Sequence, residues 1–368
     1  MTTTITLPTS QQSLDILSRL PLPQLPVGTL KILSRNADKR LIWYDTTNKI
    51  VYAVDSTVAA ADRKILYASY DYCLTWIEVY TMTGNNYIGF IYTLASGYHL
   101  IRNGYTGKIG RLPADFSSIT YSASVGTYQP LNSAATGIVE YNGILLYAEY
   151  SVAEGAICYI KKSYDDGITW YVSLDGTGLR HFHGVQVDPY TGYFWAYSGD
   201  SDAACKIFKC EAITADANPD TWVEMTGGTQ ADRTCGLAFT KDYVYWAMDS
   251  TSSPKVYKAD KATFTPAEVL AVPGDSCVLG AAMMVDMSIV FWTRIEETSS
   301  QQNYASFFIL ADDAVVLEQK FICEPSSGAT FSQGFTRGSF VDDNNVWFVE
   351  GVQVTMDGLI GFVLPMGL

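Results

Sequence analysis

The chain has 368 residues, of which 24 are Lys or Arg and 38 are Asp or Glu, so its formal net charge at pH 7 is −14. This excess of negative charge repels nucleic-acid phosphates and anionic membrane surfaces, and we expect neither a nucleic-acid partner nor membrane insertion. Only 17% of the residues are charged, whereas 25 Tyr, 16 Phe, 8 Trp and 29 Gly favour an all-β fold of aromatic strands joined by tight turns.

Residues 1–28 fit no repeating unit and are predicted to form an N-terminal arm for docking or assembly. A Thr-rich start with alternating apolar residues could add a strand to another sheet, and a short helix predicted over residues 10–20 would have one apolar side. We expect the arm to dock on the outer surface of its own domain or on a neighbouring subunit. The anchoring side chains would be Ile5, Leu7, Leu14, Ile16, Leu17 and Leu20.

From residue 29 onward, aromatic β segments recur at steps of 46 to 56 residues, marked by Tyr52, Tyr98, Tyr147, Trp195, Tyr245, Phe291 and Trp347. A short apolar strand that often opens with Gly precedes each marker, as in "GVQVD" (184–188) and "GSFVD" (338–342), and two further strands follow it. Four antiparallel strands in about 45 residues are typical of one propeller blade. Residues 29–368 are therefore predicted to form a seven-bladed β-propeller.

The last unit offers only three strands, and "TLKILS" (29–34) belongs to no unit. A ring of blades must close, and pairing a strand from one end of the chain with the blade at the other end removes two exposed sheet edges. Residues 29–34 are therefore predicted to be the outer strand of the last blade.

The segment "SYDDGITW" falls between the third and fourth strands of the third unit, with Ser163, Asp165, Gly167, Thr169 and Trp170 at fixed intervals. Asp accepts hydrogen bonds from nearby backbone N–H groups, Gly takes a positive φ, and Trp buries its ring between sheets. The pattern predicts a tight turn.

A second copy, "SYDYCLTW", occupies the same place in the first unit. It keeps Ser69, Asp71, Thr75 and Trp76, but Cys73 replaces the glycine. Both copies resemble the Asp-box of sialidase-like, or BNR-repeat, propellers, and the resemblance covers roughly residues 29–368. In that family the box lies on the outer rim, away from the catalytic pocket, so the resemblance implies a fold and not a reaction.

A sialidase of this family would need three arginines on the substrate carboxylate, a Tyr–Glu nucleophile pair and an acid Asp. Arg180, Arg233 and Arg337 stand just before predicted inner strands of different blades, which places them at one mouth of the central channel. These arginines are candidates for ligand binding there. Alternatively, they neutralise acidic loops such as those of Asp232 and Asp342.

Two features argue against sialidase chemistry. The only piece similar to the family's early Arg-Ile-Pro signature is "GRLP" (110–113), which lies after the first box and in a predicted third strand. Glu140 is the clearest glutamate on an inner strand, and no Tyr partner can be assigned to it. We therefore assign no catalytic residue.

"HFH" places His181 and His183 on one face of a strand, also at the predicted channel mouth. They could hold a metal with a third ligand from a neighbouring blade or simply line a solvated channel, and we favour the second reading. Asp200 and Asp202 alternate in "SGDSDA", but the full ligand loop of a calcium site is lacking. No metal and no cofactor are expected.

Seven cysteines are scattered without paired spacing, which indicates small buried thiols made in a reducing compartment and neither a disulfide framework nor a zinc site. A basic start followed by an apolar stretch, the mark of a secretion signal, is missing from the first residues. An extracellular role remains compatible with this observation if the chain is a phage protein, because phage proteins leave the host by lysis and need no secretion signal.

We therefore expect a non-enzymatic structural or adhesive propeller in a phage virion appendage or a surface filament. Its partners would be further copies of the chain or other virion proteins, bound through the arm, with a glycan as an additional ligand. An exo-sialidase or related glycosidase is the alternative.

Overall fold

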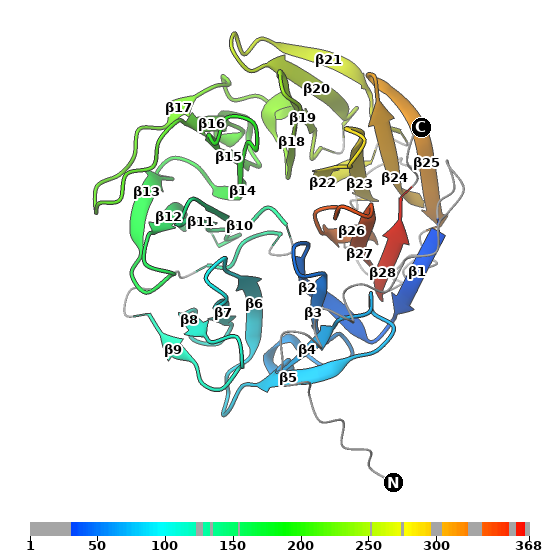
Figure 1. Cartoon of the computed structure of the whole chain (residues 1–368). Coiled ribbons are helices and arrows are strands. Elements are labelled where there is room, and N and C mark those ends of the chain that lie inside the picture. Colours follow the sequence, from blue (N-terminus) through cyan, green and yellow to red (C-terminus); the bar gives the residue numbers. More distant parts are fainter. Residues whose placement is uncertain are drawn as a thin grey trace.

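The computed structural model describes residues 31–122, 128–132, 135–153, 155–250, 252–273, 276–295, 304–322, 333–352 and 358–364. They form the predicted all-β propeller of seven blades, each with four antiparallel strands, around a common axis (Figure 1). The arm of residues 1–28 lies outside the described residues. Within the described part of the chain, the helical elements are three 3-10 turns, η1 (Ala60–Asp62), η2 (Asp202–Ala204) and η3 (Gln230–Asp232).

Five blades are separate four-stranded sheets whose strands follow chain order from the axis outward. Their strands are β2 (Lys39–Asp45), β3 (Ile50–Asp55), β4 (Ile65–Ser69) and β5 (Ile77–Thr81); β6 (Ile88–Thr93), β7 (His99–Asn103), β8 (Ile109–Leu112) and β9 (Thr120–Tyr121); β10 (Ile138–Tyr141), β11 (Ile144–Ala148), β12 (Tyr159–Ser163) and β13 (Tyr171–Asp175); β14 (His181–Val187), β15 (Phe194–Gly199), β16 (Ile207–Cys210) and β17 (Val223–Glu224); β18 (Leu237–Phe239), β19 (Tyr243–Ala247), β20 (Lys255–Asp260) and β21 (Pro266–Ala271).

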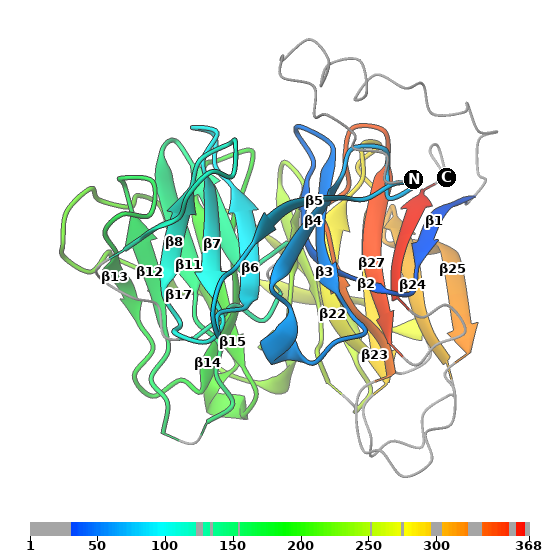
Figure 2. The same cartoon turned by 90° about the horizontal axis from the view of Figure 1, so that it is seen from below.

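The sixth and seventh blades share one sheet. The sixth blade contains β22 (Cys277–Met283), β23 (Ile289–Ile295), β24 (Tyr304–Ala311) and β25 (Ala314–Ile322), and the seventh contains β26 (Gln333–Gly338), β27 (Val346–Val352), β28 (Gly358–Val363) and β1 (Lys31–Asn36). The end of β23 also pairs with the start of β26, which joins the two blades. The strands of all the blades run roughly along the axis of the ring (Figure 2).

The predicted markers lie on or beside the second strand of every blade, and these strands carry the core. β7 and β15 are buried along their whole length because a neighbouring blade covers each face, which explains continuous apolar runs instead of alternation. Aromatic rings bridge adjacent blades: Trp292 and Trp347 have ring centroids 5.6 Å apart. The outermost strands are mostly exposed, as β21 illustrates, and their sequences are correspondingly less apolar.

An N-terminal strand closes the ring, as predicted. β1 pairs antiparallel with β28, with Ile32 opposite Phe362 and Asn36 opposite Leu359. The strand covers 31–36, compared with the predicted 29–34, of which residues 29 and 30 lie outside the described part. Figure 1 shows the two ends of the propeller side by side.

Asn36, the last residue of β1, also connects the seventh blade to the first. Its Nδ2 donates a hydrogen bond to the backbone oxygen of Cys73 at 3.1 Å, and its Oδ1 accepts one from Trp76 Nε1 at 2.8 Å. The closing strand therefore anchors the turn that carries the first motif copy.

The inner strand of the seventh blade differs from the prediction. β26 covers 333–338 instead of 338–342, although backbone hydrogen bonds from Ser339 to Phe348 and from Asp342 to Val346 continue the contact with β27. Glycine recurs near these inner strands because neighbouring blades approach closely. A Cβ on Gly236 would lie 2.7 Å from the backbone nitrogen of Ala281 in the next blade.

The two motif copies form the same turn between the third and fourth strands of their blades. In the third blade, Asp165 Oδ1 accepts hydrogen bonds from Ser163 Oγ at 2.8 Å and from the Thr169 N–H at 2.9 Å. Asp71 accepts the matching bonds from Ser69 and Thr75 at 2.8 and 2.9 Å. Burial raises the pKa of Asp165, but the hydrogen bonds from Thr169 and Ser163 outweigh it and lower the pKa below its usual value.

Replacing Gly167 with alanine is expected to destabilise the propeller by about 2–3 kcal/mol. Gly167 has a φ of +78°, and a Cβ there would lie 2.5 Å from Leu100 Cδ2 of the second blade. Urea unfolding measures the loss. Gly143→Ala is the matched control, because Gly143 has a φ of +75° and no atom within 4 Å of the added Cβ. An equal loss in both variants would show that the contact with Leu100 has no effect.

Six cysteines lie in the described residues, and all six are buried thiols outside any disulfide bond, as predicted; Cys323 lies outside them. The part of the chain that the structure describes contains no helix with the length and apolar character needed to cross a membrane.

His99 is a buried histidine of the second blade, with its ring stacked on Phe116 at a centroid distance of 4.6 Å. Burial lowers the pKa of His99 to about 4. In the unfolded chain His99 is protonated below about pH 6.5, whereas in the folded chain it stays neutral down to about pH 4. The free energy of unfolding therefore falls as the pH drops from about 6.5 towards 4. We expect this histidine to cost about 2 kcal/mol at pH 5 relative to pH 8.

The measurement is urea unfolding of the wild type and His99→Phe at both pH values. The variant keeps an aromatic ring stacked on Phe116 but has no group that titrates there. Any advantage of the wild type in free energy of unfolding at pH 8 should therefore shrink or reverse at pH 5. An identical pH dependence in both proteins would contradict the assignment.

Candidate functional site

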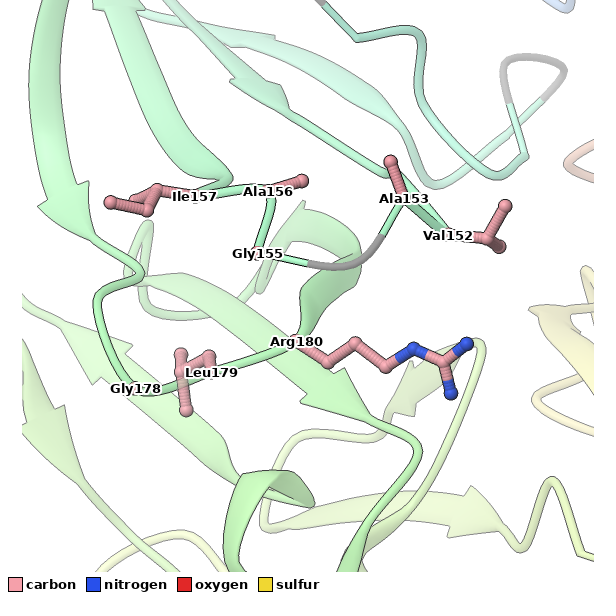
Figure 3. A pocket seen from close by; sticks show the side chains of 8 residues that line it. All are labelled: Val152, Ala153, Gly155, Ala156, Ile157, Gly178, Leu179 and Arg180. Atoms are coloured by element: carbon pink, nitrogen blue, oxygen red, sulfur yellow. The ribbon is translucent and has the colours of Figure 1, made fainter.

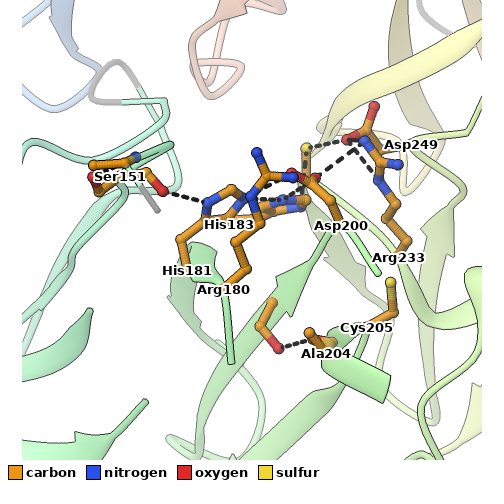
Figure 4. Close-up of polar contacts among 12 residues, drawn as sticks. Ser151, Arg180, His181, His183, Asp200, Ala204, Cys205, Arg233 and Asp249 are labelled. Atoms are coloured by element: carbon orange, nitrogen blue, oxygen red, sulfur yellow. Dashed lines mark hydrogen bonds and ion pairs between the residues drawn. The ribbon is translucent and has the colours of Figure 1, made fainter. Parts of the chain in front are cut away.

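The candidate site lies on one face of the ring, where the innermost strands begin and the second strands end; we call it the start face. Five side chains meet there and form the His–Asp–Arg cluster: Arg180, His181, His183, Asp200 and Arg233 (Figure 4). The histidines open β14, Asp200 directly follows β15, and Arg233 follows η3 of the next blade. The antiparallel pairing of β14 and β15 places His181 opposite Gly199 and brings Asp200 to the histidines.

Asp200 is the centre of the cluster. Its Oδ2 lies 2.9 Å from a terminal guanidinium nitrogen of Arg180 and 3.3 Å from His181 Nε2. Its Oδ1 lies 3.1 Å from a terminal nitrogen of Arg233 and 3.3 Å from His183 Nε2. Each carboxylate oxygen therefore contacts one arginine and one imidazole.

The two imidazoles are held from behind by backbone carbonyls of neighbouring blades. His181 Nδ1 lies 2.7 Å from the oxygen of Ser151, and His183 Nδ1 lies 2.9 Å from the oxygen of Thr234. Both histidines are almost completely buried, and the Tyr150 ring covers His181 with a centroid distance of 4.1 Å. Gly199 leaves room for this packing, because a Cβ there would lie 2.5 Å from His183 Cε1.

The electrostatics favour an ionised Asp200. Burial raises its pKa, but the contacts with His181 and His183 and the charge of Arg233 outweigh burial and hold the pKa well below its usual range. Burial, together with the nearby Asp200 carboxylate, raises the pKa of Tyr150 to about 12. The cluster thus has a firmly negative centre and a neutral tyrosine beside it at physiological pH.

A second carboxylate extends the cluster into the fifth blade. Asp249 Oδ2 accepts hydrogen bonds from Arg233 at 3.2 and 3.3 Å and lies 3.5 Å from Cys235 Sγ. Burial raises the pKa of Cys235 well above its usual value. Arg233 therefore bridges Asp200 and Asp249.

Arg337 is not part of this cluster. It lies within β26 and not before it, because the inner strand of the seventh blade begins earlier in the chain than predicted. Its Nε lies 3.3 Å from Glu350 Oε2, and Arg40 Nε lies 3.6 Å from the other oxygen of the same carboxylate. Burial and the like charge of Arg40 lower the pKa of Arg337 to about 9.

The other residues considered from the sequence are spread over the propeller. Arg111 lies in β8, the third strand of its blade as predicted, and its guanidinium carbon is 4.1 Å from the centroid of the Tyr98 ring. Glu140 lies towards the end of β10, away from the start face, and accepts a hydrogen bond from the Ala95 N–H at 2.8 Å. Asp202 accepts a hydrogen bond from Gln230 Nε2 at 2.9 Å, whereas Asp200 belongs to the His–Asp–Arg cluster.

A cavity of about 430 Å³ opens beside the cluster, with Arg180 common to both (Figure 3). Apolar side chains and backbone of two loops make up most of its wall: Val152, Ala153, Gly155, Ala156, Ile157, Gly178 and Leu179. Val152 and Ile157 are 65% and 45% exposed. A ligand at this position would meet an apolar surface next to one positive charge.

The pairing of the arginines with Asp200, Asp249 and Glu350 was not predicted from the sequence, which offered Asp232 and Asp342 as acidic neighbours, although a signal for it exists. An acidic residue stands at or just after the second strand in several blades: Asp55, Glu149, Asp200, Asp249 and Glu350. In an antiparallel blade the end of the second strand adjoins the start of the first. This repeat could therefore have predicted acidic partners for Arg180, Arg233 and Arg337.

No family model matches the chain. No curated protein matches it either. Solved structures show the fold: virginiamycin B lyase from Staphylococcus aureus has a TM-score of 0.57 at 13% identity, covering 91% of this chain and 99% of the lyase. YCF48 bound to D1 peptide gives 0.57 at 10%, covering 94% and 98%, and a chain of the mitotic checkpoint complex gives 0.56 at 8%, covering 95% and 99%. These similarities establish the propeller fold.

Proposed function

We propose that this chain is a non-enzymatic structural or adhesive propeller that assembles through residues 1–28 into a phage virion appendage or a surface filament. The arm binds a further copy of the chain or another virion protein, and the propeller contacts a protein or a glycan. The site of action is accordingly a virion or an extracellular surface assembly.

The observation that carries the proposal is the position of Asp200 between Arg180 and Arg233, at 2.9 and 3.1 Å. A glycosidase for acidic sugars needs arginines that bind the carboxylate of its substrate. Here the protein's own carboxylate takes that place. Arg337 is engaged by Glu350, and the three arginines do not converge as the sialidase-like alternative requires.

The closed ring supports a role for the arm in assembly. β1 completes the seventh blade with residues 31–36, so ring closure needs none of residues 1–28. Propellers of the same fold were solved with a D1 peptide and in the mitotic checkpoint complex. Proteins with this fold can therefore bind other proteins or peptides.

Deletion of residues 1–28 tests the proposal. We expect the full chain to form oligomers or filaments in negative-stain electron microscopy and multi-angle light scattering, and the truncated chain to be monomeric with an unchanged unfolding midpoint. The matched control is the full chain with Leu14 and Leu17 both replaced by asparagine, which keeps the length of the arm but removes apolar anchors. Unaltered assembly after the deletion would refute the role of the arm.

A fluorogenic sialoside assay on the full chain tests the alternative directly. We expect no turnover. Turnover that is abolished by Arg233→Ala and kept in Arg111→Ala, whose side chain lies in a third strand, would establish glycosidase chemistry and overturn the proposal.

A further inference from the structure

The ring nitrogens of His181 and His183 form a pattern that neutral imidazoles alone do not satisfy. Each Nδ1 faces a backbone carbonyl, at 2.7 Å from Ser151 and 2.9 Å from Thr234. A carbonyl oxygen only accepts hydrogen bonds, so each Nδ1 carries its hydrogen. A neutral imidazole has one N–H group, and each Nε2 therefore presents a lone pair.

The two lone pairs lie close to each other and to the Asp200 carboxylate. The Nε2 atoms of His181 and His183 are 3.2 Å apart, and each lies 3.3 Å from an oxygen of Asp200, which is also an acceptor. The exposed fractions of the two histidines are 0% and 1%. Arg180 and Arg233 contact the carboxylate, but neither reaches between the two Nε2 atoms, where a positive species, either an additional proton on an imidazole or a metal ion, would satisfy the facing acceptors.

We propose that His181 Nε2, His183 Nε2 and the Asp200 carboxylate bind a zinc ion. Zinc bonds to imidazole nitrogen and carboxylate oxygen are about 2.0–2.1 Å long, which places tetrahedral ligand atoms about 3.3 Å apart. The two Nε2 atoms, 3.2 Å apart, agree with this spacing, and each lies 3.3 Å from a different oxygen of Asp200, so the carboxylate faces the pair of nitrogens with both oxygens. Two imidazoles and one carboxylate are a donor set that suits zinc.

The surroundings supply the outer contacts that zinc ligands need. The carbonyls of Ser151 and Thr234 fix the histidine tautomers, and Arg180 and Arg233 orient the carboxylate. Asp200 keeps 21% of its side chain exposed, so water or a ligand atom from the start face can complete the coordination. The two arginine charges weaken the attraction for a cation, and we expect a site weaker than a structural zinc centre.

A second group of potential ligands, His183, Cys235 and Asp249, lies next to the first. It would have to use His183 Nδ1, which already faces the Thr234 carbonyl, and the Asp249 oxygen that Arg233 holds. The geometry therefore favours the first group, with Cys235 outside the coordination shell.

Zinc titration of the full chain without an affinity tag, after removal of metals with EDTA, tests the proposal against a chromophoric zinc chelator. We expect one zinc ion per chain, and a loss of roughly a hundredfold or more in affinity for His181→Gln and His183→Gln, because losing even an outer contact typically costs 10–100-fold. His99→Gln is the matched control for the number of imidazoles, and Cys235→Ser is the control for thiols; both should bind as the wild type does. Circular dichroism verifies that each variant is folded.

Nitrogen-15 NMR of the wild-type histidines provides a readout that does not depend on any variant. With zinc, the Nε2 signals of His181 and His183 should move to metal-bound values while both Nδ1 atoms keep their protons, and His99 should not change. Failure to bind zinc stoichiometrically, or binding that persists in both histidine variants, would overturn the proposal. So would two doubly protonated imidazoles at neutral pH in the presence of zinc, since the histidines would then hold Asp200 as cations.

Discussion

Replacing Asp200 with alanine is expected to destabilise the propeller by about 3 kcal/mol, the lower end of the range for removing one partner from a buried ion pair, because Asp200 and Arg180 keep 21% and 48% of their side chains exposed. Arg233 would keep its ion pair with Asp249, Arg180 would lose its ion pair with Asp200, and the imidazoles of His181 and His183 would face each other without a carboxylate. Because the pKa of Asp200 is lower in the folded chain than in the unfolded chain, its contribution is fully present in the neutral range and falls progressively as the pH drops below the usual Asp pKa of about 4.

Urea unfolding at pH 7 in EDTA measures this effect without any contribution from a bound metal. Asp202→Ala is the control, because Asp202 lies two residues away but is exposed and serves Gln230; we expect it to cost less than about 1 kcal/mol. If the two variants were equally stable, the ion pairs of the cluster would contribute nothing to the fold.

Removal of the closing strand is the second large effect. A chain that lacks residues 1–36 loses the whole of β1, its ladder to β28, the apolar contacts of Leu33 and both hydrogen bonds of Asn36. We expect it to be less stable by on the order of 5 kcal/mol than the chain that lacks residues 1–28. It should also aggregate, because the deletion exposes the edge of β28.

Thermal unfolding of the two truncated chains, followed by circular dichroism, measures the difference. Adding a peptide of residues 29–36 should restore part of the lost stability, since an extended peptide can pair with the exposed edge of β28. Equal unfolding midpoints for the two truncated chains would mean that the ring does not depend on β1.

The architecture could be predicted because the second strands have an unusual composition. Strands such as β15 and β27 are covered on both faces, so their aromatic runs stand out and repeat at the spacing of the blades. The inner strand of the seventh blade was predicted too far towards the C-terminus, because the glycine of "GSFVD" was taken as its first residue. Gly338 is instead the last residue of β26 and faces the Trp292 ring.

The site was predictable only in part. "HFH" indicated two imidazoles on one face, but their relation to Asp200 depends on the register between β14 and β15, where a shift occurs between Phe182 and Gly184. The meeting of Arg180 and Arg233 depends on how closely the fourth and fifth blades approach, which local patterns do not encode. Arg337 was misassigned together with its strand.

The seam between β1 and β28 also sets the order in which the protein can be completed. During synthesis β1 leaves the ribosome before every blade, yet Lys31 pairs with Val363 and Asn36 with Leu359. The nascent chain therefore carries an unpaired strand until almost all of the polypeptide has been translated, and this contact spans nearly the greatest sequence separation in the ring. Contacts between such distant segments form slowly, so we expect the seam to be the last part of the ring to form.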